Sequence, residues 1–115
     1  VRQPVRAKAE ELRFNLVDQT RIITAASELA RNTLQHGGGG SVAIEIVENG
    51  IRRGLRVTFK DQGPGIPDLA LAMKDGYTTG GGLGLGLSGS KRLVNEFQIL
   101  SKVGEGTEVT VTKWK

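Results

Sequence analysis

Two polar side chains at helical spacing are the first residues in this chain that could do chemistry. Glu28 and Asn32 lie in the segment SELARNTLQH, residues 27–36. Residues at i and i+4 of a helix stand on the same side of it. The amide oxygen and the carboxylate could hold a magnesium ion that keeps most of its waters and phosphate ligands, or the carboxylate could act as a general base toward a hydroxyl. Two surface residues on an amphipathic helix are the alternative interpretation.

A glycine-rich turn follows an aspartate at residues 61–66, DQGPGI. Asp61 closes an expected strand, and glycine at positions 63 and 65 permits positive φ angles and close approach of a ligand to the backbone. In such a turn the carboxylate could accept a hydrogen bond from an exocyclic amine, such as that of adenine. A simple Asx-type turn that closes a hairpin is the alternative.

Alternating glycines lead into an expected helix at residues 80–87, GGGLGLGL. Backbone amides at a helix N-terminus bind phosphate, and alternating glycines let the backbone wrap an anion; a flexible hinge is the alternative. Two better-known nucleotide motifs do not fit. A dinucleotide-binding fold needs a strand directly before Gly84, Gly86 and Gly89, where none is expected, and Gly89-Ser90-Lys91 has the order of a P-loop wrong.

The periodicity of apolar residues predicts two helices near the N-terminus. Residues 5–14 read as a helix with Pro4 at its start, and Asp18 is expected to cap a longer helix over 19–36. The longer helix has one apolar face, and Glu28 and Asn32 fall on a different side. The residues of that face are Ile22, Ile23, Ala26, Leu29, Ala30, Thr33 and Leu34.

Alternating apolar residues predict four strands in the rest of the chain. They are residues 41–48, 54–60, 97–103 and 107–114. Asn49-Gly50 indicates an antiparallel hairpin between the first two, and residues 104–106 turn between the last two. A short helix is expected at 69–74, an aperiodic loop at 75–82 and a helix at 83–96. This order predicts an α+β fold, with helices over one face of a mostly antiparallel sheet.

Length and composition limit the classes of protein. The 115 residues are expected to form one domain, 1–115. The chain contains no cysteine and one histidine, which excludes disulfides, thiol chemistry and a multi-histidine metal site. The apolar runs are too short to cross a membrane, so a cytoplasmic location is expected. Scattered basic residues, a net charge of +4 and only 4% aromatic residues argue against nucleic-acid binding.

Taken together, the motifs resemble those of the Bergerat-fold (GHKL) ATPases, which include gyrase, Hsp90, histidine kinases and MutL. They occur in the order E-x-x-x-N, D-x-G-x-G-I, G-x-G-x-G and a final G-T turn, over about residues 18–112. The chain is similar to the small anti-sigma-factor kinases, and most to the RsbT-type switch kinases of the stressosome. The segments that carry this similarity are SELARN, DQGPGIPD, DGYTTGGGLGLGL, KRLVNEF and EGTEVTVTKW.

The resemblance implies a two-layer α/β sandwich with a mixed, mostly antiparallel sheet, and it implies roles for single residues. Glu28 would orient or deprotonate the substrate hydroxyl, Asn32 would hold Mg²⁺, and Asp61 would bond the adenine amine of ATP. Residues 67–81 would form the ATP lid. Further contacts to the nucleotide would come from Gly63, Gly65, Ile66, Gly82, Leu83, Gly84, Leu85, Gly86 and Thr107.

Three features depart from the family pattern or stay open. The N-terminal strand of the family is missing, which indicates a truncation before Val1. His36 matches a common family position and is expected to cap the helix rather than do chemistry. Lys74, Lys91 and Arg92 are candidates for contact with the γ-phosphate.

The activity implied by the resemblance is that of an ATP- and magnesium-dependent serine/threonine protein kinase. Its substrate would be a STAS-domain antagonist protein, and phosphorylation would switch partners in a sigma-factor or stress-response pathway. A PP2C-type phosphatase or another downstream regulator is a further expected partner. The alternative is an anti-sigma factor that sequesters a sigma factor in an ATP-dependent way.

Overall fold

The computed structural model describes residues 2–63, 65 and 86–115. The elements in chain order are α1 (Arg2–Glu11), α2 (Leu16–Gly37), β1 (Gly40–Asn49), β2 (Arg52–Asp61), α4 (Gly86–Arg92), β3 (Glu96–Lys102) and β4 (Gly106–Trp114). The expected helix at 69–74, loop at 75–82 and lid at 67–81 lie outside the described residues.

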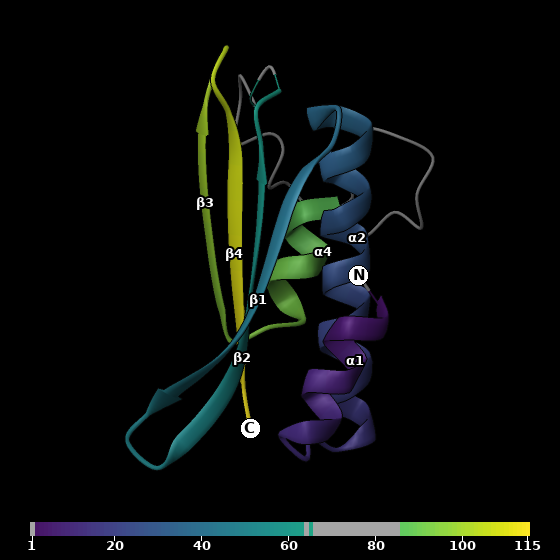
Figure 1. Ribbon diagram of the computed structural model, residues 1–115, viewed down its shortest axis with the longest axis vertical. Coiled ribbons are helices and arrows are strands. Elements are labelled where there is room, and N and C mark those ends of the chain that lie inside the picture. The colour runs from purple at the N-terminus through teal and green to yellow at the C-terminus, as the bar shows by residue number, and fades with distance from the viewer. Residues whose placement is uncertain (1, 64, 66–85) are drawn as a thin grey trace.

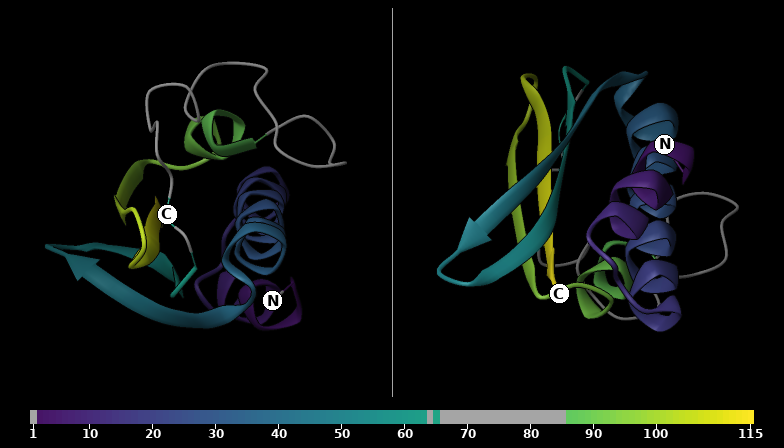
Figure 2. Two further views of the ribbon diagram at one scale, coloured as in Figure 1. Left: turned by 90° about the horizontal axis from the view of Figure 1, so that it is seen from above. Right: turned by 60° about the horizontal axis from the view of Figure 1, so that its bottom comes forward.

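The described strands form one sheet in the order β1-β2-β4-β3, in which all neighbours are antiparallel. All three described helices lie over the same face of this sheet (Figures 1 and 2). The predicted α+β class and the hairpin at Asn49-Gly50 are therefore confirmed: β1 ends at Asn49 and Gly50 takes a φ of 65°. No described helix is long and apolar enough to cross a membrane.

The core lies between the helices and the inner face of the sheet. Leu55, Val57 and Phe59 alternate along β2 and are fully or almost fully buried, as predicted. Val109 and Val111 of β4 lie opposite Phe59 and Val57 and continue this apolar surface. Because side chains alternate between the two faces of a strand, the intervening residues point to the other face of the sheet, which no described helix covers.

α1 begins and ends earlier than the predicted helix over residues 5–14. Arg13 takes a left-handed conformation with a φ of 61°. Its backbone N–H donates a hydrogen bond to Glu10 O at 2.9 Å, and the backbone N–H of Phe14 donates one to Ala9 O at 3.0 Å. These two bonds are those of a Schellman motif, which ends a helix by satisfying its last carbonyls. The apolar Phe14 belongs to the core but not to the helix.

α2 begins at Leu16 because Asn15, and not Asp18, is its N-cap. Asn15 is extended, with φ −69° and ψ 168°, and its side chain accepts a hydrogen bond from the amide of Asp18 at 2.8 Å. Both residue types cap helices well, so the local sequence allows either start. The carboxylate of Asp18 instead lies 3.4 Å from the ammonium of Lys113, which joins the start of α2 to the end of β4.

We expect replacement of Asp18 by alanine to destabilise the protein. The Lys113 side chain is 9% exposed, and a buried ammonium that loses its carboxylate is strongly unfavourable. Because Asp18 is itself partly exposed, we expect a loss of about 2 kcal/mol in the free energy of unfolding in urea, below the full loss for a buried pair. The variant D18A/K113M should recover most of the loss, and no recovery would contradict this explanation.

α4 also ends earlier than the predicted helix over residues 83–96. The amide of Asn95 donates to Thr112 O at 3.0 Å, and its side-chain oxygen accepts from the amide of Trp114 at 2.7 Å. These bonds hold Asn95 against β4, so the chain leaves the helix at Arg92 and enters β3 at Glu96. Residues 83–85 of the predicted helix lie outside the described part of the chain.

Candidate functional site

Asp61 is held at the end of β2 by two backbone amides. Its Oδ1 accepts hydrogen bonds from Gly63 N at 2.9 Å and from Thr107 N at 3.2 Å. The hydroxyl of Thr107 lies 3.0 Å from that of Ser101. No described residue donates a hydrogen bond to the second oxygen, Oδ2. The carboxylate is therefore fixed through one oxygen and can accept a hydrogen bond through the other.

The backbone approaches so closely around Asp61 that several positions, among them Gly65 and Gly106, admit only glycine. Gly65 has a φ of 78°, and a Cβ there would lie 2.4 Å from the carbonyl oxygen of Lys102. A Cβ at Gly106 would lie 2.2 Å from the carbonyl oxygen of Asp61. These contacts join the turn after β2 to the turn between β3 and β4. The predicted group of Asp61, Gly63, Gly65 and Thr107 is thus brought together.

Ser101 and Gly106 belong to the same group, although neither is among the predicted site residues. The sequence marks Gly106 only as the glycine of the final G-T turn, and it places Ser101 only in a strand. Their involvement follows from the register in which β3 and β4 pair, which sets Ser101 opposite Thr107. Nothing in the local sequence indicates that register on its own.

The C-terminal half of α2, which carries Asn32, lies at the same end of the molecule as Asp61. α2 ends at Gly37, and Gly40, the first residue of β1, pairs with Asp61. Figure 1 shows that the C-terminal ends of α2 and β2 lie at one end of the molecule, and α4 packs against α2. Asn32 is half-buried, and its side chain makes no hydrogen bond to another described residue.

Glu28 is buried, although the sequence places it away from the apolar face of α2. The residue is 7% exposed, and its carboxylate accepts a hydrogen bond from Arg31. α2 packs against α1, α4 and the strands β2 and β4, so it is covered on more than one side. Ala25, also outside the predicted face, is fully buried for the same reason. The interpretation of Glu28 as a surface residue is therefore wrong.

Part of the predicted site belongs to segments outside the described residues. Ile66 and residues 82–85, which include Gly82, Leu83, Gly84 and Leu85, lie outside the described part of the chain, as does the side chain of His36. Gly86 is the first residue of α4. Of the candidates for the γ-phosphate, Lys74 lies outside the described residues, whereas Lys91 and Arg92 are exposed in the last turn of α4.

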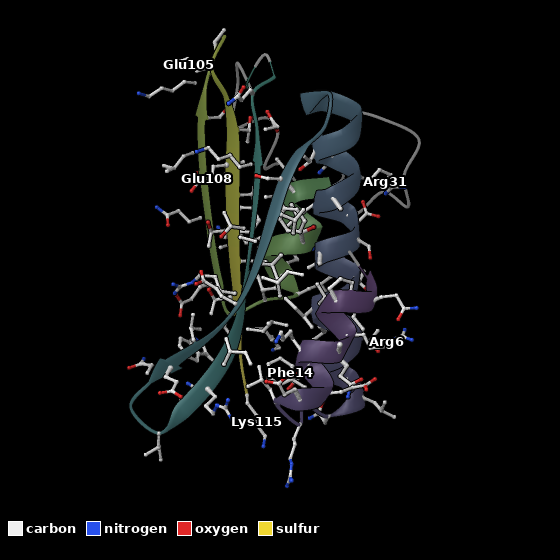
Figure 3. The ribbon with its side chains drawn as sticks, in the orientation of Figure 1. Arg6, Phe14, Arg31, Glu105, Glu108 and Lys115 are labelled. Carbon is white, nitrogen blue, oxygen red and sulfur yellow. The ribbon has the colours of Figure 1, made fainter. Side chains whose placement is uncertain are left out.

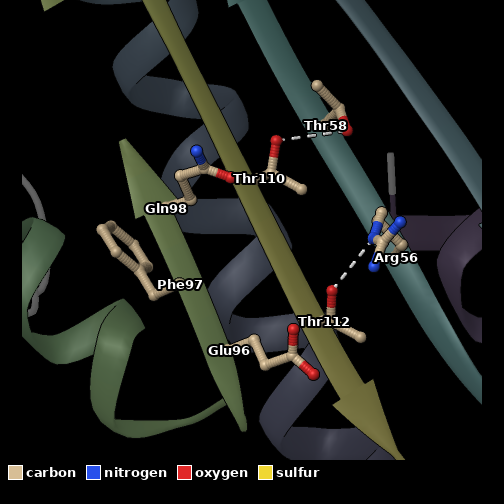
Figure 4. Close-up of a pocket in the computed structure, with 7 residues that line it drawn as sticks. All are labelled: Arg56, Thr58, Glu96, Phe97, Gln98, Thr110 and Thr112. Carbon is tan, nitrogen blue, oxygen red and sulfur yellow. Dashed lines mark hydrogen bonds between the residues drawn. The ribbon is translucent and has the colours of Figure 1, made fainter. Parts of the chain in front are cut away.

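A polar hollow of about 410 Å³ lies on the opposite face of the sheet from the helices. Figure 4 shows its lining, in which Arg56 donates to the hydroxyl of Thr112 at 3.2 Å and the hydroxyls of Thr58 and Thr110 are 3.5 Å apart. Arg56, Thr58, Thr110 and Thr112 alternate with the inward-facing core residues of β2 and β4. This hollow is therefore separate from the group around Asp61.

Comparison with known proteins decides the family. Residues 17–115 match the family described as "Histidine kinase-, DNA gyrase B-, and HSP90-like ATPase". The chain belongs to this ATPase family. The superfamily predicted from the four motifs is confirmed, and membership of this family implies that the chain uses ATP.

Individual members of the family define a narrower group. The chain is 52% identical over 113 residues to "Serine/threonine-protein kinase RsbT" of Bacillus subtilis (strain 168), which covers 98% of this chain and 85% of that protein. It is 32% identical over 120 residues to "Anti-sigma F factor" of Geobacillus kaustophilus (strain HTA426), which covers 97% of this chain and 80% of that protein. Both agree with the predicted similarity to small anti-sigma-factor kinases, and the first agrees with the predicted class of enzyme.

A solved structure supports the fold. The sensor histidine kinase "MprB" from mycobacteria superposes with a TM-score of 0.54 at 20% identity, over 84% of this chain and 70% of that one. At this level of identity the similarity concerns the fold alone, and it confirms the predicted Bergerat-type architecture.

Proposed function

We propose that this protein is an ATP- and magnesium-dependent serine/threonine protein kinase that phosphorylates STAS-domain antagonist proteins. In this role it acts in the cytoplasm as a partner-switching regulator of a sigma-factor or stress-response pathway. One observation carries the proposal: in a member of an ATPase family, α2 holds the Glu28 carboxylate nearly out of solvent, one helical turn before Asn32. A protein that only binds ATP does not need a buried carboxylate one helical turn before Asn32.

The adenine end of the nucleotide is proposed to lie at Asp61. Its Oδ2 accepts a hydrogen bond from the adenine amine, while Gly63 and Thr107 hold Oδ1. Gly65 is proposed to lie beside the base on the resemblance of its motif, and the close backbone of Lys102 explains why this position must be glycine. Ile66 and residues 82–86 are proposed to contact the base and the phosphates, on the resemblance of their motifs.

Asn32 is proposed to hold the magnesium ion through its amide oxygen. Within the described residues there is no group of three or more acidic or histidine side chains that could hold a metal. A single amide ligand fits an ion that keeps its waters and takes further oxygens from the phosphates of ATP. Such an ion would neutralise part of the charge on the β- and γ-phosphates.

Glu28 is proposed to take the proton of the acceptor hydroxyl. In the transfer, the oxygen of a serine or threonine on the partner bonds to the γ-phosphorus, and the bond between the γ-phosphorus and the β–γ bridging oxygen breaks to release ADP. The proton of the hydroxyl moves to the carboxylate of Glu28, which is within one helical turn of Asn32. The new phosphate adds negative charge to the interface, which weakens the complex and frees the kinase for a second partner, such as a PP2C-type phosphatase.

The proposal is tested by mixing the protein with ATP, Mg²⁺ and a purified STAS-domain protein. We expect the intact mass of the STAS protein to rise by one phosphate, and expect no such rise when Mg²⁺ is removed with a chelator. The protein variant D61N serves as a second control. An unchanged mass, together with tight binding of both ATP and the STAS protein, would contradict the kinase assignment.

The second candidate is an anti-sigma factor that sequesters a sigma factor in an ATP-dependent way. The 32% identity to an anti-sigma F factor over nearly the whole chain favours it. This function predicts that a sigma factor co-elutes with the protein in the presence of ATP and separates from it without ATP.

A further inference from the structure

An ion pair within α2 joins Glu28 to the residue directly before Asn32. Arg31 Nη2 donates a hydrogen bond to Glu28 Oε1. The side chains of this pair are 32% and 9% exposed for Arg31 and Glu28, respectively. Figure 3 shows Arg31 on the side of α2 that faces away from the sheet. The guanidinium therefore contacts the acid that the proposed mechanism uses.

Two other pairs with the same spacing show that this one is different. Lys8–Glu11 and Arg21–Asp18 are also three residues apart, with N–O distances of 3.7 and 3.8 Å. Their side chains are more exposed, at 44% and 56% in the first pair and 50% and 24% in the second. Exposed pairs contribute little because water screens them, whereas a charge taken out of water needs a partner. Of these three pairs, Glu28–Arg31 is the one in which the carboxylate is almost completely buried and therefore needs the partner charge.

We propose that Arg31 is a positioning residue for phosphoryl transfer: it holds one oxygen of Glu28 so that the other faces the acceptor hydroxyl. Arginine suits this role because its guanidinium is always charged and donates from a rigid, planar fork. It also offsets the repulsion between Glu28 and a triphosphate bound beside Asn32. The inference rests on the proposed function, in which Glu28 takes the proton.

The first test compares R31A, R31K and the control R21A, in which an exposed arginine of the same helix is removed. Each variant is assayed for ATP affinity and for the rate of transfer from saturating ATP to the STAS-domain acceptor. We expect R31A to keep its ATP affinity and to lose about tenfold to a hundredfold in rate. R31K should recover part of this loss, because lysine keeps the charge without the fork, and R21A should match the wild type.

The same assay in an E28Q background shows whether Arg31 acts through Glu28. If it does, R31A causes no further loss of rate once Glu28 is replaced, because residues that act as a unit are not additive. A full additional loss in the E28Q background, or an R31A rate equal to that of the wild type, would overturn the inference.

A second test needs no acceptor protein. The coupling between Glu28 and Arg31 is measured by unfolding E28A, R31A and the double variant in urea, and the same cycle is made with alanine at Glu11 and Lys8. We expect a clearly larger coupling for the buried pair, and equal coupling would refute the positioning role. If the wild type transfers no phosphate, the proposed function fails; if it transfers phosphate and R31A does so equally well, only the inference about Arg31 fails.

Discussion

Replacement of Asp61 by asparagine is expected to abolish ATP binding at micromolar concentrations. Oδ1 of Asp61 accepts from two backbone amides, and Oδ2 is proposed to accept from the adenine amine. An asparagine side chain has only one oxygen, so in either orientation its NH₂ group faces another donor. The loss of a hydrogen bond to a charged group, with a donor left unpaired, is about 3 kcal/mol, or about a hundredfold in the dissociation constant.

The matched control for D61N is E105Q, which removes one negative charge from the adjacent turn between β3 and β4. Binding of a fluorescent ATP analogue, measured by anisotropy, should be unchanged in E105Q, and thermal unfolding would show whether D61N is still folded. A guanine base offers an acceptor where adenine offers a donor, so D61N should also lose its preference for ATP over GTP. Unchanged ATP affinity in D61N would remove Asp61 from the nucleotide site.

Replacement of Glu28 by glutamine is expected to leave ATP binding in place and to remove phosphoryl transfer. Glutamine has the shape of glutamate and can still accept a hydrogen bond from Arg31, so α2 should keep its packing. It cannot take a proton from the acceptor hydroxyl, and loss of a general base lowers the rate by about a hundredfold to ten-thousandfold. The single-turnover rate of transfer to the STAS-domain protein is the direct measurement.

E10Q is the control for this experiment, because it makes the same chemical change at an exposed position of α1. It should transfer phosphate at the wild-type rate. Transfer by E28Q at the wild-type rate would show that Glu28 is not the base. A parallel loss of ATP affinity in E28Q would instead indicate a role in binding the nucleotide or its magnesium ion.

The sequence by itself determined the strands, the hairpin and the family. Alternation of apolar residues along β2 predicts which side chains are inward, because the two faces of a strand meet different environments. Asn49-Gly50 predicts its turn because glycine accepts a positive φ without strain. The motifs around Glu28, Asp61 and the glycines at 82–86 indicated the ATPase family because their order and spacing are specific, although each is weak alone.

Only the tertiary structure decided where the helices end and which polar residues are buried. α2 begins at Leu16 because Asn15 is its N-cap, while the carboxylate of Asp18 pairs with Lys113 of β4, a contact that the local sequence does not contain. α4 ends at Arg92 because Asn95 forms backbone and side-chain hydrogen bonds with β4. Glu28 is buried because α2 packs against other helices as well as the sheet, so helical periodicity alone misplaces it. Periodicity and capping act over a few residues, whereas burial depends on neighbours that are distant in the chain.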